Sequence, residues 1–365
     1  MWFCLINLFS HLKTTHNYIM SNTSSSNDDT HNSEEMCTSC EQNKNVGTCA
    51  DNTSSTNIDT INLDKSSTFT DSISICANCG KDEESSGHLK FCAACKSVKY
   101  CSRECQAAHR LQHKKECRKR AAELHDEKLF KVPPPNEDCP ICMIQLPVLE
   151  MGRRYMPCCG KVVCSGCVHA VQIRSKGFGL CPFCRTPTPS SSKEMLILGN
   201  KRIDLGDAAA MFIHGCMYDE GLLGLPQDSN KAIELWHQAG ELGYAEAYLN
   251  LGNEYARGVH VERDRKKAIH YWGLASMGGD AQARYNLGAF EEEIGNLDKA
   301  LKHWMIAAVG GYKKSLKEIK ELYTNGHATK DDYAKALRAY QSYLDDIRSD
   351  QRDEAAAFTD EFKYY

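Results

Sequence analysis

The C-terminal half of the chain repeats a pattern of small, aliphatic and aromatic positions. Three segments begin with alanine and end with glycine at the same spacing: Ala208–Gly215, Ala245–Gly252 and Ala281–Gly288. The period is 37 residues (208 to 245) and then 36 (245 to 281). Each segment precedes a second helical stretch that ends in tryptophan, at Trp236, Trp272 and Trp304, and a weaker fourth unit runs from Gly311 with Tyr333–Tyr340 as its second helix.

Such a unit predicts a helical hairpin. Small residues such as Ala245, Ala247 and Gly252 allow its two helices to approach closely. One hairpin cannot cover its own apolar face, so neighbouring units must stack into a solenoid, which we expect over residues 206–347. The tryptophans and tyrosines are interpreted as packing residues. Solenoids usually bind partners along the concave face, and the sequence does not show which face that is.

The remaining segments are more polar. Residues 21–75 are mostly Ser, Thr, Asn and Asp, and we expect residues 1–75 to form a disordered tail, because too little apolar surface is available to offset the ordering entropy. Residues 118–137 combine a basic helix with a linker at Pro133–Pro135. A second boundary lies near Thr188, and 348–365 is predicted to be a C-terminal tail.

The composition of the chain says more about the cellular compartment of the protein than about its binding partners. A net charge of −4 with 25% charged residues names no ligand class. The apolar stretch Trp2–Phe9 is shorter than a membrane span and lacks a preceding basic region, and no later segment is apolar enough to cross a membrane. The chain has 20 cysteines, many in Cys-x2-Cys pairs, which in a reducing compartment indicate metal rather than disulfides. We therefore expect a cytoplasmic and/or nuclear protein.

Fifteen cysteines and one histidine lie between residues 76 and 184 in two consecutive ladders. The ladder positions are Cys76, Cys79, Cys92, Cys95, Cys101, Cys105, His113 and Cys117, then Cys139, Cys142, Cys158, Cys159, Cys164, Cys167, Cys181 and Cys184. Closely spaced thiolates can bind one tetrahedral zinc, so eight ligands predict two Zn²⁺ ions per ladder. Four protein ligands per ion leave no open position, which predicts structural rather than hydrolytic zinc. A further pair, Cys37 and Cys40 with Cys49 nearby, is interpreted as free thiols, with a partial metal site as the alternative.

The first ladder resembles the MYND zinc finger, through its eight filled ligand positions and its tail from Tyr100 to Cys117. The resemblance implies interleaved pairing, with one ion on Cys76, Cys79, Cys101 and Cys105 and another on Cys92, Cys95, His113 and Cys117. His109 is interpreted as a packing or hydrogen-bonding residue. The family mostly binds proline-containing peptides; Gln106 matches its pattern, whereas Arg110 stands where a tryptophan is usual.

The second ladder resembles a RING finger, through Cys139-Pro-Ile-Cys142 and Cys181-Pro-Phe-Cys184. The resemblance implies one ion on Cys139, Cys142, Cys164 and Cys167, and another on Cys181, Cys184 and a middle pair. Lys161 stands where histidine is usual, and an ammonium has no lone pair to donate. We predict that Cys158 and Cys159 complete the second site, and His169 is the alternative ligand.

RING fingers commonly act as ubiquitin ligases that recruit a ubiquitin-conjugating enzyme and orient its thioester, without a nucleophile of their own. By resemblance, Ile141 and Pro182 would contact that enzyme. Arg185 follows the last ligand, where a planar guanidinium can engage enzyme and ubiquitin together. The alternative function is a non-catalytic adaptor in which every module binds protein.

The repeats resemble Sel-one-like repeats, relatives of the tetratricopeptide repeat that serve as adaptor scaffolds. The expected architecture is thus multidomain: a MYND-type module at 76–117, a RING-type module at 138–187 and an all-α solenoid, after a disordered tail. Nucleic acid is not an expected partner, because acidic residues such as Glu116 and Glu123 dilute the basic stretch from Arg110 to Lys131.

Overall fold

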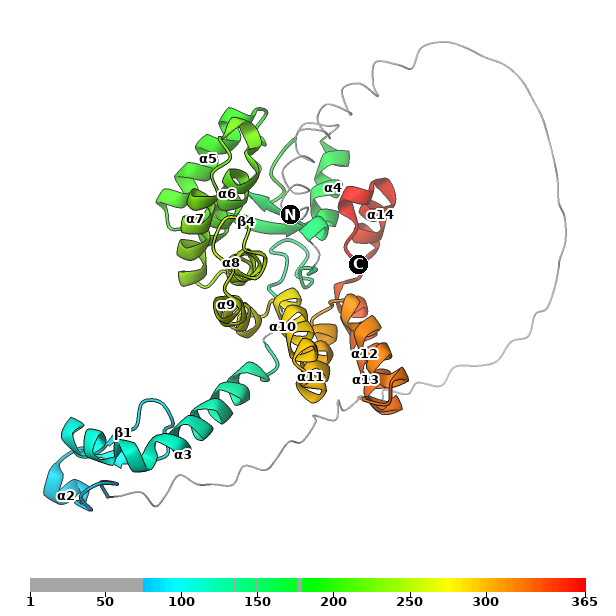
Figure 1. Ribbon diagram of the computed structural model, residues 1–365. Coiled ribbons are helices and arrows are strands. Elements are labelled where there is room, and N and C mark those ends of the chain that lie inside the picture. The colour runs from blue at the N-terminus through cyan, green and yellow to red at the C-terminus, as the bar shows by residue number, and fades with distance from the viewer. Residues whose placement is uncertain (1–74, 134–135, 149, 176–178) are drawn as a thin grey trace, which may run out of the picture. The chain divides into compact units, whose positions relative to one another are not determined.

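The computed structural model describes residues 75–133, 136–148, 150–175 and 179–365. They divide into two compact units, one ending at Leu124 and one beginning at His125. The first unit holds the first cysteine ladder, and the second holds the second ladder together with the repeats (Figure 1). None of the described helices combines the length and hydrophobicity that a membrane span requires. The predicted N-terminal tail, including Cys37, Cys40 and Cys49, lies outside the described residues.

The first cysteine module, residues 75–117, is a small hairpin followed by a long helix. Strand β1 (Lys90–Phe91) pairs antiparallel with β2 (Lys99–Tyr100), after a short helix, α2 (Glu83–Ser86). Helix α3 (Arg103–Leu129) then follows; its buried residue, Leu129, lies beyond this module, in the second unit. The module's core consists of Cys76, Leu89, Cys92, Cys95 and Tyr100. So small a core cannot stabilise a fold by apolar burial alone.

The second cysteine module, residues 138–187, is built on a second hairpin. Strand β3 (Arg153–Met156) pairs antiparallel with β4 (Lys161–Cys164), and helix α4 (Ser165–Arg174) follows at once. A one-turn helix, η1 (Glu150–Gly152), leads into β3. Alternation along β3 buries Arg154 and Met156, since successive side chains point to opposite faces.

The repeats form a solenoid of helical hairpins, in which each helix packs on the next (Figure 1). A preceding helix, α5 (Ser192–Asp204), packs on the first hairpin. The hairpins are α6 (Ala208–Glu220) with α7 (Ser229–Glu241), α8 (Ala245–Arg257) with α9 (Arg265–Met277), α10 (Ala281–Glu293) with α11 (Leu297–Val309), and α12 (Lys314–Thr324) with α13 (Lys330–Ile347). The predicted solenoid of stacked hairpins is confirmed.

A glycine in each of the first three hairpins lies against a tryptophan of the second helix. A Cβ atom there would come within 2.6, 2.4 and 2.4 Å of an indole ring, at Gly215 with Trp236, Gly252 with Trp272 and Gly288 with Trp304. Real Cβ atoms essentially never lie this close, so only glycine permits the contact. Trp236 and Trp304 are almost fully buried, as the packing interpretation requires. The spacing of small and aromatic residues therefore encodes how closely the two helices approach.

Two segments that the sequence analysis left without an element are helical. Helix α5 lies just after the predicted boundary near Thr188. The predicted C-terminal tail instead forms α14 (Asp350–Phe358) and a one-turn helix, η3 (Asp360–Phe362). Helix α14 packs against α4 of the second cysteine module (Figure 1). Short helices carry little periodicity in sequence, so their burial depends on a distant partner that the local pattern does not reveal.

The segment predicted as a linker is also packed where it is described. The Phe130 ring lies 4.6 Å from the ring of His303 in α11. Lys299 Nζ lies 2.8 Å from a carboxylate oxygen of Asp126. Burial of His303 lowers its pKa to about 3, with nearby Arg284 adding to the effect, so this imidazole is neutral beneath Phe130.

Candidate metal centres and the solenoid groove

Four Cys-x2-Cys pairs fold into the same tight turn. The residue after the second cysteine has a positive φ, namely 72° at Gly80, 56° at Lys96, 56° at Met143 and 63° at Arg185. Its N–H donates to the carbonyl of the pair's first cysteine across 2.9, 3.0, 2.9 and 3.0 Å respectively. Three of the four residues are not glycine, and this conformation costs them roughly 1–2 kcal/mol each. Strain of that kind persists only where the surroundings require the turn, here by directing two sulfurs to one point.

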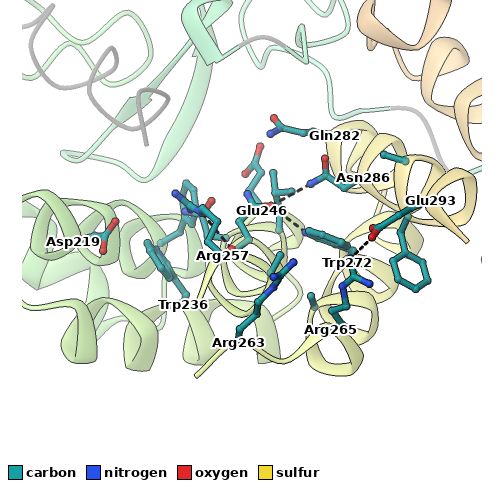
Figure 2. Close-up of a pocket in the computed structure, with 18 of the residues that line it drawn as sticks. Asp219, Trp236, Glu246, Arg257, Arg263, Arg265, Trp272, Gln282, Asn286 and Glu293 are labelled. Atoms are coloured by element: carbon teal, nitrogen blue, oxygen red, sulfur yellow. Dashed lines mark hydrogen bonds and ion pairs between the residues drawn. The ribbon is translucent and has the colours of Figure 1, made fainter. Parts of the chain in front are cut away.

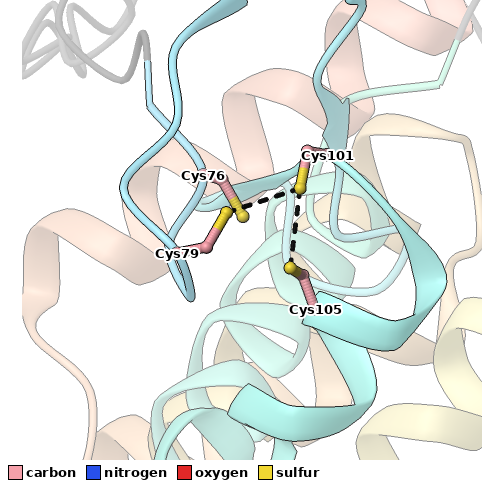
Figure 3. A group of neighbouring side chains, drawn as sticks. All are labelled: Cys76, Cys79, Cys101 and Cys105. Carbon is pink, nitrogen blue, oxygen red and sulfur yellow. Dashed lines mark hydrogen bonds between the residues drawn. The ribbon is translucent and has the colours of Figure 1, made fainter. Parts of the chain in front are cut away.

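The turns bring the ladder residues together in four clusters. In each, one ligand atom from every member lies within 4.8 Å of all the others. The clusters are Cys76, Cys79, Cys101 and Cys105 (Figure 3); Cys92, Cys95, His113 and Cys117; Cys139, Cys142, Cys164 and Cys167; and Cys158, Cys159, Cys181 and Cys184. These are the interleaved sets that the two family resemblances imply.

The spacing within the clusters suits zinc. With Zn–S bonds of about 2.3 Å, sulfurs at the corners of a tetrahedron lie about 3.8 Å apart. The structure has Cys142 and Cys164 at 3.7 Å and Cys159 and Cys181 at 3.8 Å. A disulfide would need about 2.05 Å, and all of these cysteines are free. The four donor sets therefore fit a tetrahedral metal ion.

The first module uses one helix to serve two clusters. On α3, His113 follows Cys105 by eight residues and Cys117 follows His113 by four, so the three share a face. Cys105 joins the first cluster, whereas Nε2 of His113 lies 3.3 Å from Sγ of Cys95 in the second. Between them, His109 Nδ1 lies 3.1 Å from the Tyr100 hydroxyl, and its ring stacks on His113. His109 thus hydrogen-bonds and packs, as predicted, and orients a ligand neighbour.

In the second module the middle pair is Cys158 and Cys159 rather than a set that includes His169. Sγ of Cys158 lies 3.4 Å from Sγ of Cys184. His169 is buried on α4 with its ring 4.8 Å from Phe358, away from the cluster. Burial lowers the pKa of His169, so the imidazole packs there in its neutral form. Lys161 is no ligand either; its ammonium lies over the Phe183 ring.

One thiol in every cluster is poised to ionise. Side-chain hydrogen bonds from Cys164, then Cys167, lower the pKa of Cys139. The Thr186 hydroxyl does the same for Cys184, whose pKa falls to about 6. Burial opposes ionisation of Cys76 and Cys92, but backbone N–H donors outweigh it and lower both pKa values to about 6. A thiolate is the form that binds metal, so each cluster has a ready first ligand.

The residues predicted to contact a conjugating enzyme differ in accessibility. Ile141, in the first turn of the module, is 40% exposed. Arg185 is exposed at the last turn, with no ion pair among the described residues, whereas Pro182 is buried. Phe183 beside it is 44% exposed. Two of the three predicted contact residues thus face solvent.

The solenoid carries a groove of about 450 Å³ along its first three hairpins (Figure 2). Aromatic, amide and charged side chains line it, among them Trp236, Trp272, Asn250, Asn253, Asn286, Arg263, Arg265 and Glu293. Asn253 is one of the lining residues, and its Oδ1 accepts hydrogen bonds of 3.1 Å from both Trp272 and Asn286. Arg265 and Glu293 form an ion pair at one end. The structure thereby identifies the candidate partner-binding face that the sequence left open.

Comparison with known families agrees with this geometry. The MYND finger model matches residues 76–117. Residues 76–117 are a MYND-type zinc finger. The Sel1 repeat model matches residues 208–244 and 245–280. The chain therefore combines a zinc-finger metal-binding module with Sel1-like repeats, and both are protein-interaction modules. The matched residues do not include 139–184.

Solved structures resemble parts of the chain. A Sel1 repeat protein from Oxalobacter formigenes is 28% identical, with 35% of this chain and 98% of that one covered and a TM-score of 0.33. The protective antigen c5321 of uropathogenic Escherichia coli, which has an SLR fold, is 18% identical, with 58% and 62% covered and a TM-score of 0.32. Likenesses this partial carry no argument about function. None of the curated proteins compared with the chain is a match.

Sequence reasoning missed the residues that enclose the third cluster. Sγ of Cys167 lies 3.6 Å from Oε1 of Gln351, and the guanidinium of Arg352 reaches Cys142. Both residues lie on α14, more than 180 positions along the chain. No local motif marks them, because nothing near them in sequence has metal-ligand spacing.

Proposed function

We propose that this chain is a zinc-stabilised ubiquitin ligase in which the second cysteine module recruits a ubiquitin-conjugating enzyme. The observation that carries the proposal is the cross-braced pairing of its cysteines. Residues 139 and 142 meet 164 and 167, while 158 and 159 meet 181 and 184. Two interleaved metal sites hold the two outer turns of the module, so Ile141 and Arg185 are presented on rigid backbone.

The chemistry assigned to the module is orientation. It holds no nucleophile of its own; the enzyme that it recruits carries ubiquitin as a thioester. The exposed apolar side chain of Ile141 would dock that enzyme. The guanidinium of Arg185 would hydrogen-bond to enzyme and ubiquitin at once, restricting the thioester to a reactive geometry. Four structural zinc ions, two per module, complete the proposal.

Substrate selection is assigned to the MYND-type module and the solenoid groove. Oδ1 of Asn253, a residue that lines the groove, accepts two hydrogen bonds, whereas its NH₂ group has no partner among the described residues. Amide groups beside the partly exposed Trp272 suit an extended peptide, whose backbone offers both donors and acceptors. This supports a protein substrate bound in cis to the recruited enzyme.

The test is self-ubiquitylation of the purified, zinc-loaded full chain with a panel of conjugating enzymes. Arg185→Ala and Ile141→Ala should each reduce chain formation by roughly tenfold or more, since orientation is lost. Lys96→Ala is the matched control: Lys96 is also a cation with positive φ after the second cysteine of such a turn, but in the first module. It should leave the rate unchanged.

A second candidate function is a non-catalytic adaptor. The buried position of Pro182 and the polar groove favour binding without transfer. If a zinc-loaded protein forms no ubiquitin chains with any conjugating enzyme and captures none in a binding assay, the ligase proposal fails and the adaptor stands.

A further inference from the structure

Arg352 is a charged residue in an unusual environment. Its side chain on α14 is fully buried, with 0% exposed. No carboxylate within the described part of the chain forms an ion pair with it. Removing a guanidinium from water costs several kcal/mol unless charge or hydrogen bonds compensate. The compensating partners therefore indicate what the residue does.

All of those partners except Ile347, the last residue of α13, belong to the turn that carries Cys139 and Cys142 or follow it directly. One terminal nitrogen donates to the carbonyl of Gln145 at 2.8 Å and to that of Ile347 at 2.6 Å. The other donates to the carbonyl of Ile144 at 3.0 Å, and it lies 3.9 Å from Sγ of Cys142. The Ile144 carbonyl also accepts the N–H of Cys139. The planar fork thus braces the backbone next to two ligands of the third cluster.

The close approach is built into α4 as well. A Cβ atom at Gly166 would lie 3.0 Å from both Cγ and the backbone nitrogen of Arg352. Gly166 lies between the ligands Cys164 and Cys167, so the absence of a side chain there lets α14 reach the cluster. The Gln351 amide lies beside Cys167 on the same side. Its oxygen and nitrogen are interchangeable by rotation, so it can donate to a thiolate.

Electrostatics supplies the reason for a cation. Four thiolates around a Zn²⁺ ion carry a net charge of −2, and the third cluster is largely buried. Uncompensated charge in a low-dielectric interior is costly, and a buried cation at hydrogen-bonding distance offsets it. The same pairing explains why Arg352 needs no carboxylate. Each charge stabilises the other.

We propose that Arg352 is the outer-shell counter-ion and positioning residue of the cluster formed by Cys139, Cys142, Cys164 and Cys167. The C-terminal segment 349–365 is then a functional part of the second cysteine module rather than an appendage. The inference rests on metal binding by that cluster, which the proposed ligase function also uses. It does not rest on ubiquitin transfer.

The experiment compares zinc retention in the full-length, zinc-loaded protein and its variants. A chromophoric chelator competes for the metal, released thiols are alkylated, and mass spectrometry assigns each alkylated cysteine to its cluster. Arg352→Met should weaken zinc binding roughly 10- to 100-fold at the third cluster, the range typical for loss of an outer-shell partner. The other three clusters should retain zinc as in the wild type.

Two further variants separate charge from packing. Arg352→Lys keeps the cation but cannot fork to two carbonyls, so its zinc retention should be intermediate. Arg348→Met is the matched control, because Arg348 lies four residues earlier and is exposed. Wild-type retention in Arg352→Met, equal losses at all four clusters, or a lysine variant as weak as the methionine variant would each overturn the proposal. A wild-type protein that binds zinc but transfers no ubiquitin would contradict the proposed ligase function and leave the proposed role of Arg352 intact.

Discussion

Each of the two cysteine modules has eight ladder residues in two clusters, but the modules differ in which residues cover those clusters. The first builds its small core entirely from its own residues, Cys76 to Tyr100. The core of the second includes Ala355 and Phe362, from the far end of the chain. The Ser165 hydroxyl donates to the Phe362 carbonyl at 3.2 Å, and a terminal nitrogen of Arg154 donates to that of Glu361 at 3.0 Å. A small cysteine module can thus be built from residues close together in sequence, as the first one is. The second module, of similar size, in addition packs against a segment from the far end of the chain.

Removing the metal should give the largest effect. Structural zinc contributes on the order of 10–16 kcal/mol per site in small fingers, more than the apolar burial of either module can replace. After chelation, amides of 75–124 should exchange with solvent at rates near those of an unfolded chain. Hydrogen exchange measured by mass spectrometry should also show faster exchange in residues 138–187, and α14 should lose part of its protection.

The solenoid is the internal control for this experiment, because α6 to α11 pack through alanine, leucine and tryptophan without metal. Their exchange should stay as in the zinc-loaded protein. Fast exchange throughout α6 to α11 would mean that the repeats depend on the metal modules.

Truncation of the Phe362 side chain should affect the second module but not the first. Its side chain is 2% exposed in the core of the second module, and Phe362→Ala should destabilise that module by about 3–5 kcal/mol. Hydrogen exchange in β3, β4 and α4 should accelerate, while that of the first module stays constant. Phe358→Ala, in the same segment but 60% exposed, should do much less. Equal effects of the two changes would argue that the segment merely lies on the module.

The smallest expected effect concerns the exposed face of α3. Leu111 is 89% exposed, so Leu111→Ala should change the stability of the first module by no more than about 0.5 kcal/mol. Leu89→Ala, at 8% exposed in the same module, should cost about 2–5 kcal/mol. Thermal unfolding of the zinc-loaded variants measures both. A large loss from Leu111→Ala would reveal a packing partner for this face.

The ligand chemistry and the repeats could be read from sequence because both are local. Cys-x2-Cys spacing specifies a turn whose sulfurs converge, and the glycine-tryptophan spacing specifies how a hairpin packs. The structure brings together every ladder residue in the expected set. His169 shows the limit: its spacing permits ligation, but its side chain turns toward Phe358 instead.

Contacts between distant segments were beyond sequence reasoning. Judged from its sequence neighbours, Arg352 is an ordinary charged residue in a polar tail. Only the packing of α14 on α4 places it beside Cys142. Likewise, the groove that Asn253 lines exists because three hairpins stack and bring distant side chains together. The amino-acid sequence by itself determined the closely spaced cysteine pairs that could bind metal and the helical hairpins, since each depends on residues a few positions apart. The tertiary structure decided which surfaces those elements share, because burial and charge compensation depend on partners that no local spacing specifies.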